Sequence, residues 1–196
     1  MKIIAVERVY NEWPEAARQA LASDAFPAPA CLKATLMTDS AVVRPGTPLF
    51  LPDFAVDWRL EIVPVAVISR LGKWIEPRFA HRYYTEVSLA ARLVPPQGAP
   101  CGAFEANFDG AIAPGHAVAA PSDGAFTICL DEKEEISLSA EMLHMDDTVA
   151  LASRFMMLKT GDIIAPCRTP LYVTPVPGTR VSATLNGVSV IDLKIR

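Results

Sequence analysis

The chain has 196 residues, of which 51% are hydrophobic and 20% are charged. This balance excludes a disordered chain, and the length favours one domain with a substantial core. The formal net charge of −4 and the scattered basic residues give no reason to expect nucleic acid or an anionic membrane as a partner.

The proline and cysteine content narrows the expected structural class and the expected cellular compartment. The chain has 17 prolines against 10 glycines, which favours short strands and turns over long helices. We see no secretory leader and no run long enough to span a bilayer. The four cysteines lie far apart, so we expect a cytoplasmic protein with buried free thiols at Cys31, Cys101, Cys129 and Cys167.

The first third of the chain predicts strands separated by a long loop. Lys2–Val6 is a short apolar strand, and Glu12–Ala22 has helix formers at helical spacing with a proline in the first turn. Prolines at 27, 29, 45 and 48 make Ala25–Pro52 a loop with short strands. Trp58–Ser69 is apolar almost throughout, which predicts a long strand covered on both faces.

The middle of the chain predicts a helix and then a hairpin. Pro77–Arg92 is expected to form a helix that starts at its proline, followed by a loop over Leu93–Pro100. Ala125–Leu130 and Glu135–Ser139 alternate on either side of a charged tip at 131–134, which is typical of a β-hairpin.

The last third predicts one helix and a second hairpin. Asp146 or Asp147 is expected to cap a helix that runs to about Leu158 and is ended by Gly161. Asn186-Gly187 stands between two alternating segments, the strongest short-range hairpin signal. Because strands outnumber helices, the predicted class is α+β, mostly β, in a single domain over residues 1–196.

Several short motifs, in order, give the chain a family resemblance. They are Arg8 and Tyr10 in the opening segment, Cys31-Leu32-Lys33, a strand with Arg59-Leu60-Glu61, Ala91-Arg92, Asn107-Phe108-Asp109-Gly110, and Leu158-Lys159-Thr160-Gly161-Asp162 followed by Thr169-Pro170. Together they resemble the fumarylacetoacetate hydrolase family over nearly the whole chain. The resemblance implies a mixed β-sheet roll with peripheral helices, and a homodimer.

The resemblance also implies a metal-dependent chemistry. Members of that family cleave or rearrange 1,3-dicarbonyl acids such as acylpyruvates. A Glu-x-Glu strand and a later aspartate hold Mg²⁺ or Mn²⁺, which chelates the keto-acid oxygens and stabilises the departing enolate. Residues two apart on a strand face the same way, so both glutamates reach one ion.

Most of the metal-ligand positions of this chain carry side chains that do not suit a divalent cation. By alignment to the family they are Arg59, Glu61 and Ser88. Arginine stays protonated and has no lone pair to donate, so Glu61 is the one carboxylate ligand that is kept. We therefore expect no metal cofactor. The alternative is Mg²⁺ or Mn²⁺ bound through Glu61 and Glu86, if Glu86 takes the place of Ser88.

The expected catalytic side chains are missing as well. The position of the family's histidine base is Trp13, and the position of its oxyanion-neutralising lysine is Ala106. His116 is either a solvated loop histidine or a relocated base, since its ordinary pKa suits that task. Catalytic residues are therefore left unassigned.

Four residues are candidate ligand contacts: Arg59, Arg92, Asp109 and Thr169. Arg59 shares a strand face with Glu61, so it forms an ion pair there or clamps a ligand carboxylate with its planar fork. Arg92 and Thr169 match family positions that contact the substrate, with a salt bridge and a turn hydroxyl as the structural alternatives. Asp109 either caps a turn or lines the pocket.

Two functions follow from this pattern. The first is a family protein with a degenerate active site, a pseudoenzyme that binds a small carboxylate or keto acid and does not carry out metal-dependent acylpyruvate hydrolysis. The alternative is an active enzyme with an altered site, acting on a small keto acid as a carbon–carbon hydrolase, decarboxylase or isomerase.

Overall fold

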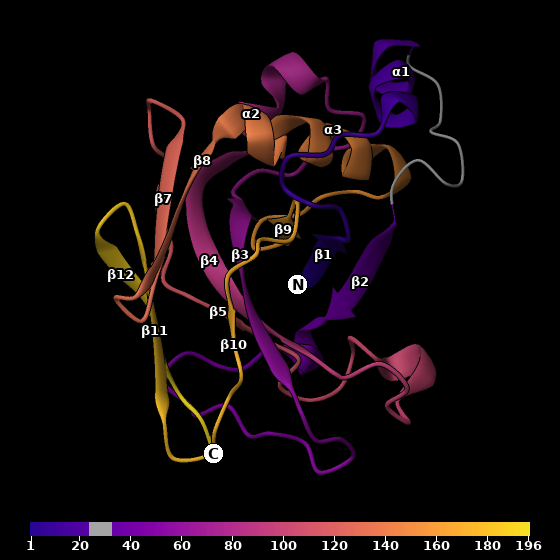
Figure 1. Cartoon of the computed structure of the whole chain (residues 1–196). Coiled ribbons are helices and arrows are strands. Elements are labelled where there is room, and N and C mark those ends of the chain that lie inside the picture. Colours follow the sequence, from indigo (N-terminus) through magenta and orange to yellow (C-terminus); the bar gives the residue numbers. More distant parts are fainter. Residues whose placement is uncertain (24–32) are drawn as a thin grey trace.

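Two β-sheets form the body of the protein, and the α-helices lie near one end of them (Figure 1). The computed structural model describes residues 1–23 and 33–196. The larger sheet contains β1 Lys2–Val6, β2 Ala34–Thr38, β3 Arg59–Ile68, β4 Tyr84–Val94, β5 Ile112–Pro114, β6 Val118–Ala119, β9 Ile163–Ala165 and β10 Tyr172–Val173. The smaller sheet contains β7 Ala125–Leu130, β8 Glu134–Ser139, β11 Arg180–Leu185 and β12 Val188–Lys194. The helices are α1 Glu15–Ser23, α2 Ala140–Leu143 and α3 Met145–Phe155, with 3-10 turns η1 Asp39–Ala41, η2 Pro77–Arg82 and η3 Gly102–Phe104.

The strand β3 is the centre of the larger sheet. The strand order is β2-β1-β9-β3-β4-β5, and β10 pairs with the first residues of β3. Along the antiparallel β3–β4 pair, Glu61 lies opposite Arg92 and Val65 lies opposite Ser88. On its other side Glu61 pairs with Tyr172 of β10. The start of β3 therefore has a neighbour on both sides.

Both faces of β3 are covered, as the sequence predicts. Leu60 and Ile62 pack into the main core between the two sheets, with buried residues of β4, β7, β11 and β12. Val63 and Val65 belong to a second core with Ile3 of β1. Since side chains alternate along a strand, Glu61 points to the side of this second core and not into the space between the sheets.

The helices cover the end of the larger sheet. Val149 of α3 packs with Ile4, Ile68 and Ala80, and Leu151 of α3 packs with α1. Figure 1 shows α1 and α3 together beyond the ends of the strands.

Several elements confirm their predictions. The strands at Lys2–Val6 and Arg59–Ile68 are present, and so are the hairpins β7–β8 and β11–β12. Asn186 and Gly187 both have positive φ, 49° and 78°, as a tight hairpin turn requires. The helix expected over Glu12–Ala22 is present but begins at Glu15, after the proline.

The helix predicted for Pro77–Arg92 is wrong. Its first residues form the 3-10 turn η2, and Tyr84–Val94 forms the strand β4. This strand is central and buried on both faces, so its apolar residues do not alternate and no period distinguishes it from a buried helix. The β-branched and aromatic residues Tyr84, Thr85 and Val87 were the available strand signal.

The helix α3 also differs from its prediction. Its N-cap is His144, in the left-handed conformation at φ 48°, and not Asp146 or Asp147. It ends at Phe155, because the chain then turns extended to pair Leu158 with Gly72.

The remaining structural expectations have mixed outcomes. Cys167 is buried, and burial raises the pKa of its thiol to about 12. Cys101 and Cys129 are free but only partly buried. Cys31, with most of the Cys31-Leu32-Lys33 motif and the first part of the predicted loop, lies outside the described residues. Within the described ranges, no helix has the length and apolar character needed to cross a membrane.

Candidate functional site

Glu61 is a buried carboxylate held by two guanidinium groups. Its side chain is 3% exposed. Arg59 Nη2 lies 2.6 Å from Glu61 Oε1, so the expected ion pair between these residues is present. Arg168 donates from Nε to Glu61 Oε2 at 3.0 Å and from Nη2 to Oε1. These hydrogen bonds raise the pKa of Arg168 above its ordinary value. Both oxygens of Glu61 are therefore occupied by donors.

A second ion pair lies beside the first. Arg92, on β4 opposite Glu61, has its Nη2 2.5 Å from Oε1 of Glu7, which follows β1. Thr35 on β2 donates to the same Glu7 oxygen at 3.2 Å. The side chains of Arg92 and Glu7 are 9% and 13% exposed, so this pair is largely withdrawn from solvent.

A pocket of about 280 Å³ opens over these groups. Its walls are Glu7, Val9, Tyr10, Arg59, Glu61, Arg168, Thr169, Pro170 and Tyr172. At this pocket the two glutamates are covered, whereas the side chains of Arg59 and Arg168 remain 43% and 35% exposed. The surface that meets a ligand is therefore cationic.

The candidate ligand contacts separate into two groups. Arg59 and Thr169 line the pocket, and Arg92 reaches it through Glu7. Thr169 Oγ1 donates to the carbonyl of Ile62 at 2.6 Å, which is the structural alternative raised for it. Asp109 is exposed in a turn and is not among the lining residues, so the structure does not bring it to this pocket.

Ser88 is not a neighbour of Glu61, which corrects its expected place as a metal-ligand position. It pairs with Val65, four residues farther along β3, or about 13 Å at the rise of a strand. Its hydroxyl donates to the carbonyl of His116 at 2.8 Å. Glu86 lies farther still, opposite Val67. Neither residue reaches the Glu61 carboxylate.

The positions expected to carry a base or a lysine have structural roles. Trp13 stacks on His144 with ring centroids 4.7 Å apart, and Ala106 is buried in the second core. His116 is exposed and lines a different, smaller hollow next to Val190. None of these side chains is among those lining the Glu61 pocket.

The donor set does not fit Mg²⁺ or Mn²⁺. Such ions need several oxygen ligands in near-octahedral order. The described residues contain no group of three or more His, Cys, Asp or Glu side chains placed to hold a metal. The oxygens of Glu61 already accept hydrogen bonds from fixed cations, which also repel a divalent ion.

Sequence reasoning did not identify Arg168, although a signal was present. Arg168 directly precedes Thr169-Pro170, where the resembled family ending reads Gly-Thr-Pro. A long cationic side chain in place of glycine beside a ligand site is a change that adds charge to the pocket. Reading it together with Arg59 would have indicated two cations facing one carboxylate.

Comparison with solved structures finds the same architecture at low sequence identity. The 5-carboxymethyl-2-hydroxymuconate delta-isomerase of Mycobacterium smegmatis aligns over 99% of this chain and 78% of its own, with 18% identity and a TM-score of 0.78. The fumarylpyruvate hydrolase of Pseudomonas aeruginosa, in complex with Mn²⁺ and pyruvate, aligns over 100% and 89%, with 17% identity and a TM-score of 0.72.

A protein from Yersinia pestis CO92 assigned to the fumarylacetoacetate hydrolase family aligns over 100% of this chain and 93% of its own, with 15% identity and a TM-score of 0.72. The chain has the fumarylacetoacetate hydrolase fold. The expected class, α+β and mostly β with mixed sheets and few helices, is thereby confirmed. No family sequence model matches the chain, and no curated protein matches it by sequence.

Proposed function

We propose that this chain binds a small organic monocarboxylate in the Glu61 pocket and does not carry out metal-dependent hydrolysis of acylpyruvates. One observation carries the proposal. Glu61, the retained metal-ligand candidate, is held by Arg59 and by a bidentate Arg168, so fixed cations stand where a divalent ion would bind a keto acid. Arginine forks are suited to carboxylate geometry.

The charge count of the pocket supports a singly charged ligand. Three guanidiniums, from Arg59, Arg92 and Arg168, face two carboxylates, from Glu7 and Glu61, which leaves one positive charge. The partly buried position makes an uncompensated charge costly. One ligand carboxylate balances this cluster, whereas a dianion would overcompensate it.

The remaining walls favour a ligand with an apolar body. Val9, Tyr10, Pro170 and Tyr172 line the pocket, and Tyr172 is 50% exposed. The Arg59 guanidinium lies 5.3 Å from the centre of the Tyr172 ring. An apolar or aromatic group next to these side chains would be removed from water, which favours its binding.

One further observation agrees with a carboxylate ligand. Pyruvate, a monocarboxylate, is present together with a manganese ion in two of the structures that share this fold.

A titration with matched ligands tests the proposal. Benzoate carries one carboxylate on an apolar ring, benzamide is its neutral counterpart, and isophthalate adds a second carboxylate. We expect benzoate to shift the ¹⁵N–¹H signals of the Arg59 and Arg168 side chains saturably, with isophthalate weaker and benzamide without effect. Equal responses to benzoate and benzamide, or no response to benzoate, would contradict the proposal.

The second candidate function is an active keto-acid enzyme with an altered site. It is supported by the hydrolases and the isomerase that share the fold. Turnover of an acylpyruvate that depends on Mg²⁺ or Mn²⁺ and is abolished by EDTA would establish it in place of the binding function.

A further inference from the structure

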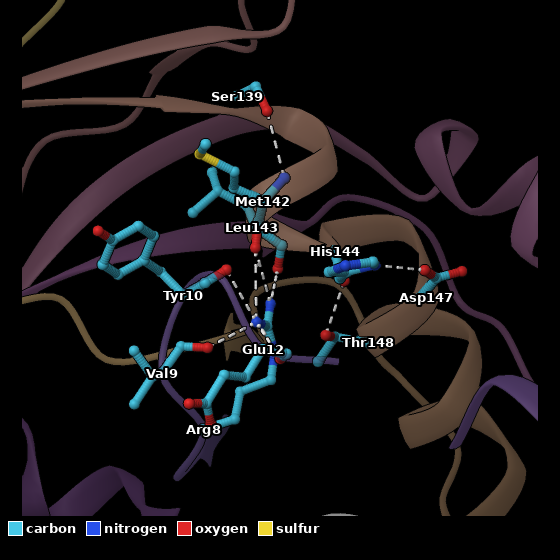
Figure 2. A network of polar contacts seen from close by, with 10 residues as sticks. All are labelled: Arg8, Val9, Tyr10, Glu12, Ser139, Met142, Leu143, His144, Asp147 and Thr148. Atoms are coloured by element: carbon cyan, nitrogen blue, oxygen red, sulfur yellow. Dashed lines mark hydrogen bonds and ion pairs between the residues drawn. The ribbon is translucent and has the colours of Figure 1, made fainter. Parts of the chain in front are cut away.

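Arg8 lies behind the wall of the Glu61 pocket and is not among its lining residues. Arg8 follows Glu7 directly in the chain and is 6% exposed. Arg8 Nη1 donates to the carbonyls of Val9 at 3.0 Å, Tyr10 at 3.0 Å and Glu12 at 2.8 Å. These three bonds curl residues 9–12 around the guanidinium, as Figure 2 shows.

The other side of the Arg8 guanidinium contacts the end of α2. Nη2 donates to the carbonyl of Leu143, and the carbonyl of Met142 lies 3.4 Å away. The Arg8 guanidinium carbon is 5.2 Å from the centre of the Trp13 ring, which stacks on His144 at the junction of α2 and α3. Arg8 therefore joins two parts of the chain that are more than a hundred residues apart (Figure 2).

Burying this cation is expensive. Burial lowers the pKa of Arg8, although the carboxylates of Asp147 and Glu12 act in the opposite direction. Among the residues that the structure describes, its hydrogen bonds go to carbonyl oxygens, and Nε has no partner. A group with this cost and no carboxylate in contact gains its stabilisation from the backbone that it organises.

The organised backbone is the pocket wall. Glu7, Val9 and Tyr10 all line the pocket, and they flank or follow Arg8 directly. The backbone amide of Arg168 donates to the Arg8 carbonyl at 2.8 Å, so the segment carrying the second pocket cation is attached to the same residue.

We infer that Arg8 is a positioning residue of the carboxylate pocket. It holds the wall formed by residues 7–12 against α2, and ligand affinity depends on it although it does not touch the ligand. The role of Arg8 rests on the proposed function of the pocket. It adds that α2 and the α2–α3 junction support the geometry of that pocket.

Arg8→Met, Arg8→Lys and Arg154→Met test the inference. Arg154 is the control, because it is similarly buried, at 4% exposure, and donates to the carbonyls of Ala20 and Leu21 in α1, which are not among the pocket-lining residues. We expect Arg8→Met to weaken benzoate binding about tenfold and Arg8→Lys about threefold, since lysine restores donors to some carbonyls. Arg154→Met should lower stability and leave benzoate affinity unchanged.

Hydrogen exchange without ligand separates this inference from the proposed function. The amide of Glu12, bonded to the Val9 carbonyl, and that of Arg168 should exchange faster in Arg8→Met and not in Arg154→Met. The amide of Ile62 in β3 is the reference. Its exchange should speed up in either variant only as much as the loss of global stability of that variant requires. If wild type does not bind benzoate, the proposed function fails, and the exchange rates of the Glu12 and Arg168 amides alone decide whether Arg8 positions the pocket wall. Unchanged exchange at Glu12 and Arg168, or benzoate binding equal to wild type in a folded Arg8→Met, would overturn the positioning role.

Discussion

Arg168 and Glu61 are separated by 107 residues, and Arg168 donates to both oxygens of the Glu61 carboxylate, with 3.0 Å between Nε and Oε2. Arg59 contacts the same carboxylate from two residues away on β3. A carboxylate that is shared by two guanidiniums has little remaining capacity to ligate a metal ion. Arg59 and Arg168 also line the pocket and their side chains stay 43% and 35% exposed, so their guanidiniums can bind an anionic ligand.

The first prediction concerns Arg168. Arg168→Met should abolish benzoate binding and destabilise the fold by about 1–2 kcal/mol, less than the roughly 3–5 kcal/mol typical of a fully buried pair, because Arg168 is partly exposed and Arg59 still neutralises Glu61. Arg180→Met is the control, since it breaks a bidentate pair with Asp192 that is exposed on both sides. Thermal unfolding and benzoate titration measure both effects. A benzoate-binding Arg168→Met would show that this guanidinium is not a ligand contact.

The second prediction concerns the charge of the cluster. Glu61→Gln raises the pocket charge by one, so it should strengthen benzoate binding while it lowers stability by about 1–3 kcal/mol, because the two guanidiniums lose the negative charge of the carboxylate and one of its two acceptor oxygens. Benzoate should restore part of that stability by binding the folded state. Glu76→Gln, in an exposed pair with Arg78, should change neither property. Weaker benzoate binding in Glu61→Gln would contradict the charge argument.

The third prediction concerns metal binding. Calorimetric titration of wild type with Mn²⁺ or Mg²⁺ should show no site tighter than millimolar. Arg59→Glu with Ser88→Asp should not create one, because Ser88 lies opposite Val65 and not beside Glu61. Arg59→Glu with Arg168→Gly should bind Mn²⁺ measurably, since it places two carboxylates on one strand face and removes both guanidiniums. Equal Mn²⁺ affinity in the two double variants would contradict the interpretation that Arg59 and Arg168 prevent metal binding at Glu61 and that Ser88 lies away from it.

The local elements of the fold could be predicted because their chemistry is local. Asn186-Gly187 specifies its own turn, and the apolar run at Arg59–Ile68 specifies a buried strand. The strand Tyr84–Val94 could not be distinguished from a helix, since what makes it a strand is its long register with β3. Pairing partners of that kind are tertiary information, and they override local propensity.

The candidate site was predictable to a similar extent. The Arg59–Glu61 pair follows from strand geometry alone, because residues two apart share a face. The bond from Arg168 to Glu61, and the pairing of Arg92 with Glu7, depend on how distant segments converge. Asp109 and Ser88 illustrate the same point in reverse. Alignment of motifs gave Ser88 as a metal-ligand position and Asp109 as a candidate ligand contact, and the strand register and the turn place them elsewhere.

The last prediction concerns acid stability at the attachment of β1. Burial would raise the pKa of Asp162, but hydrogen bonds from the Lys2 side chain and from the backbone amides of Lys159 and Lys2 hold it below its ordinary value of 3.8. The folded state therefore binds a proton less readily than the unfolded state. The resulting stabilisation is complete above about pH 5 and is lost as the pH falls through the folded-state pKa, below 3.8.

Urea unfolding of wild type and Asp162→Asn between pH 2.5 and 6 checks this expectation. The stability difference between them should be constant near pH 6 and should shrink below pH 3.8, where the wild-type carboxylate becomes protonated. Lys2→Met removes the ammonium partner of Asp162, so the loss of stability should begin at higher pH than in wild type. A difference between wild type and Asp162→Asn that stays the same across the whole range would show that the ionised form of Asp162 does not stabilise the junction of β1 and β9.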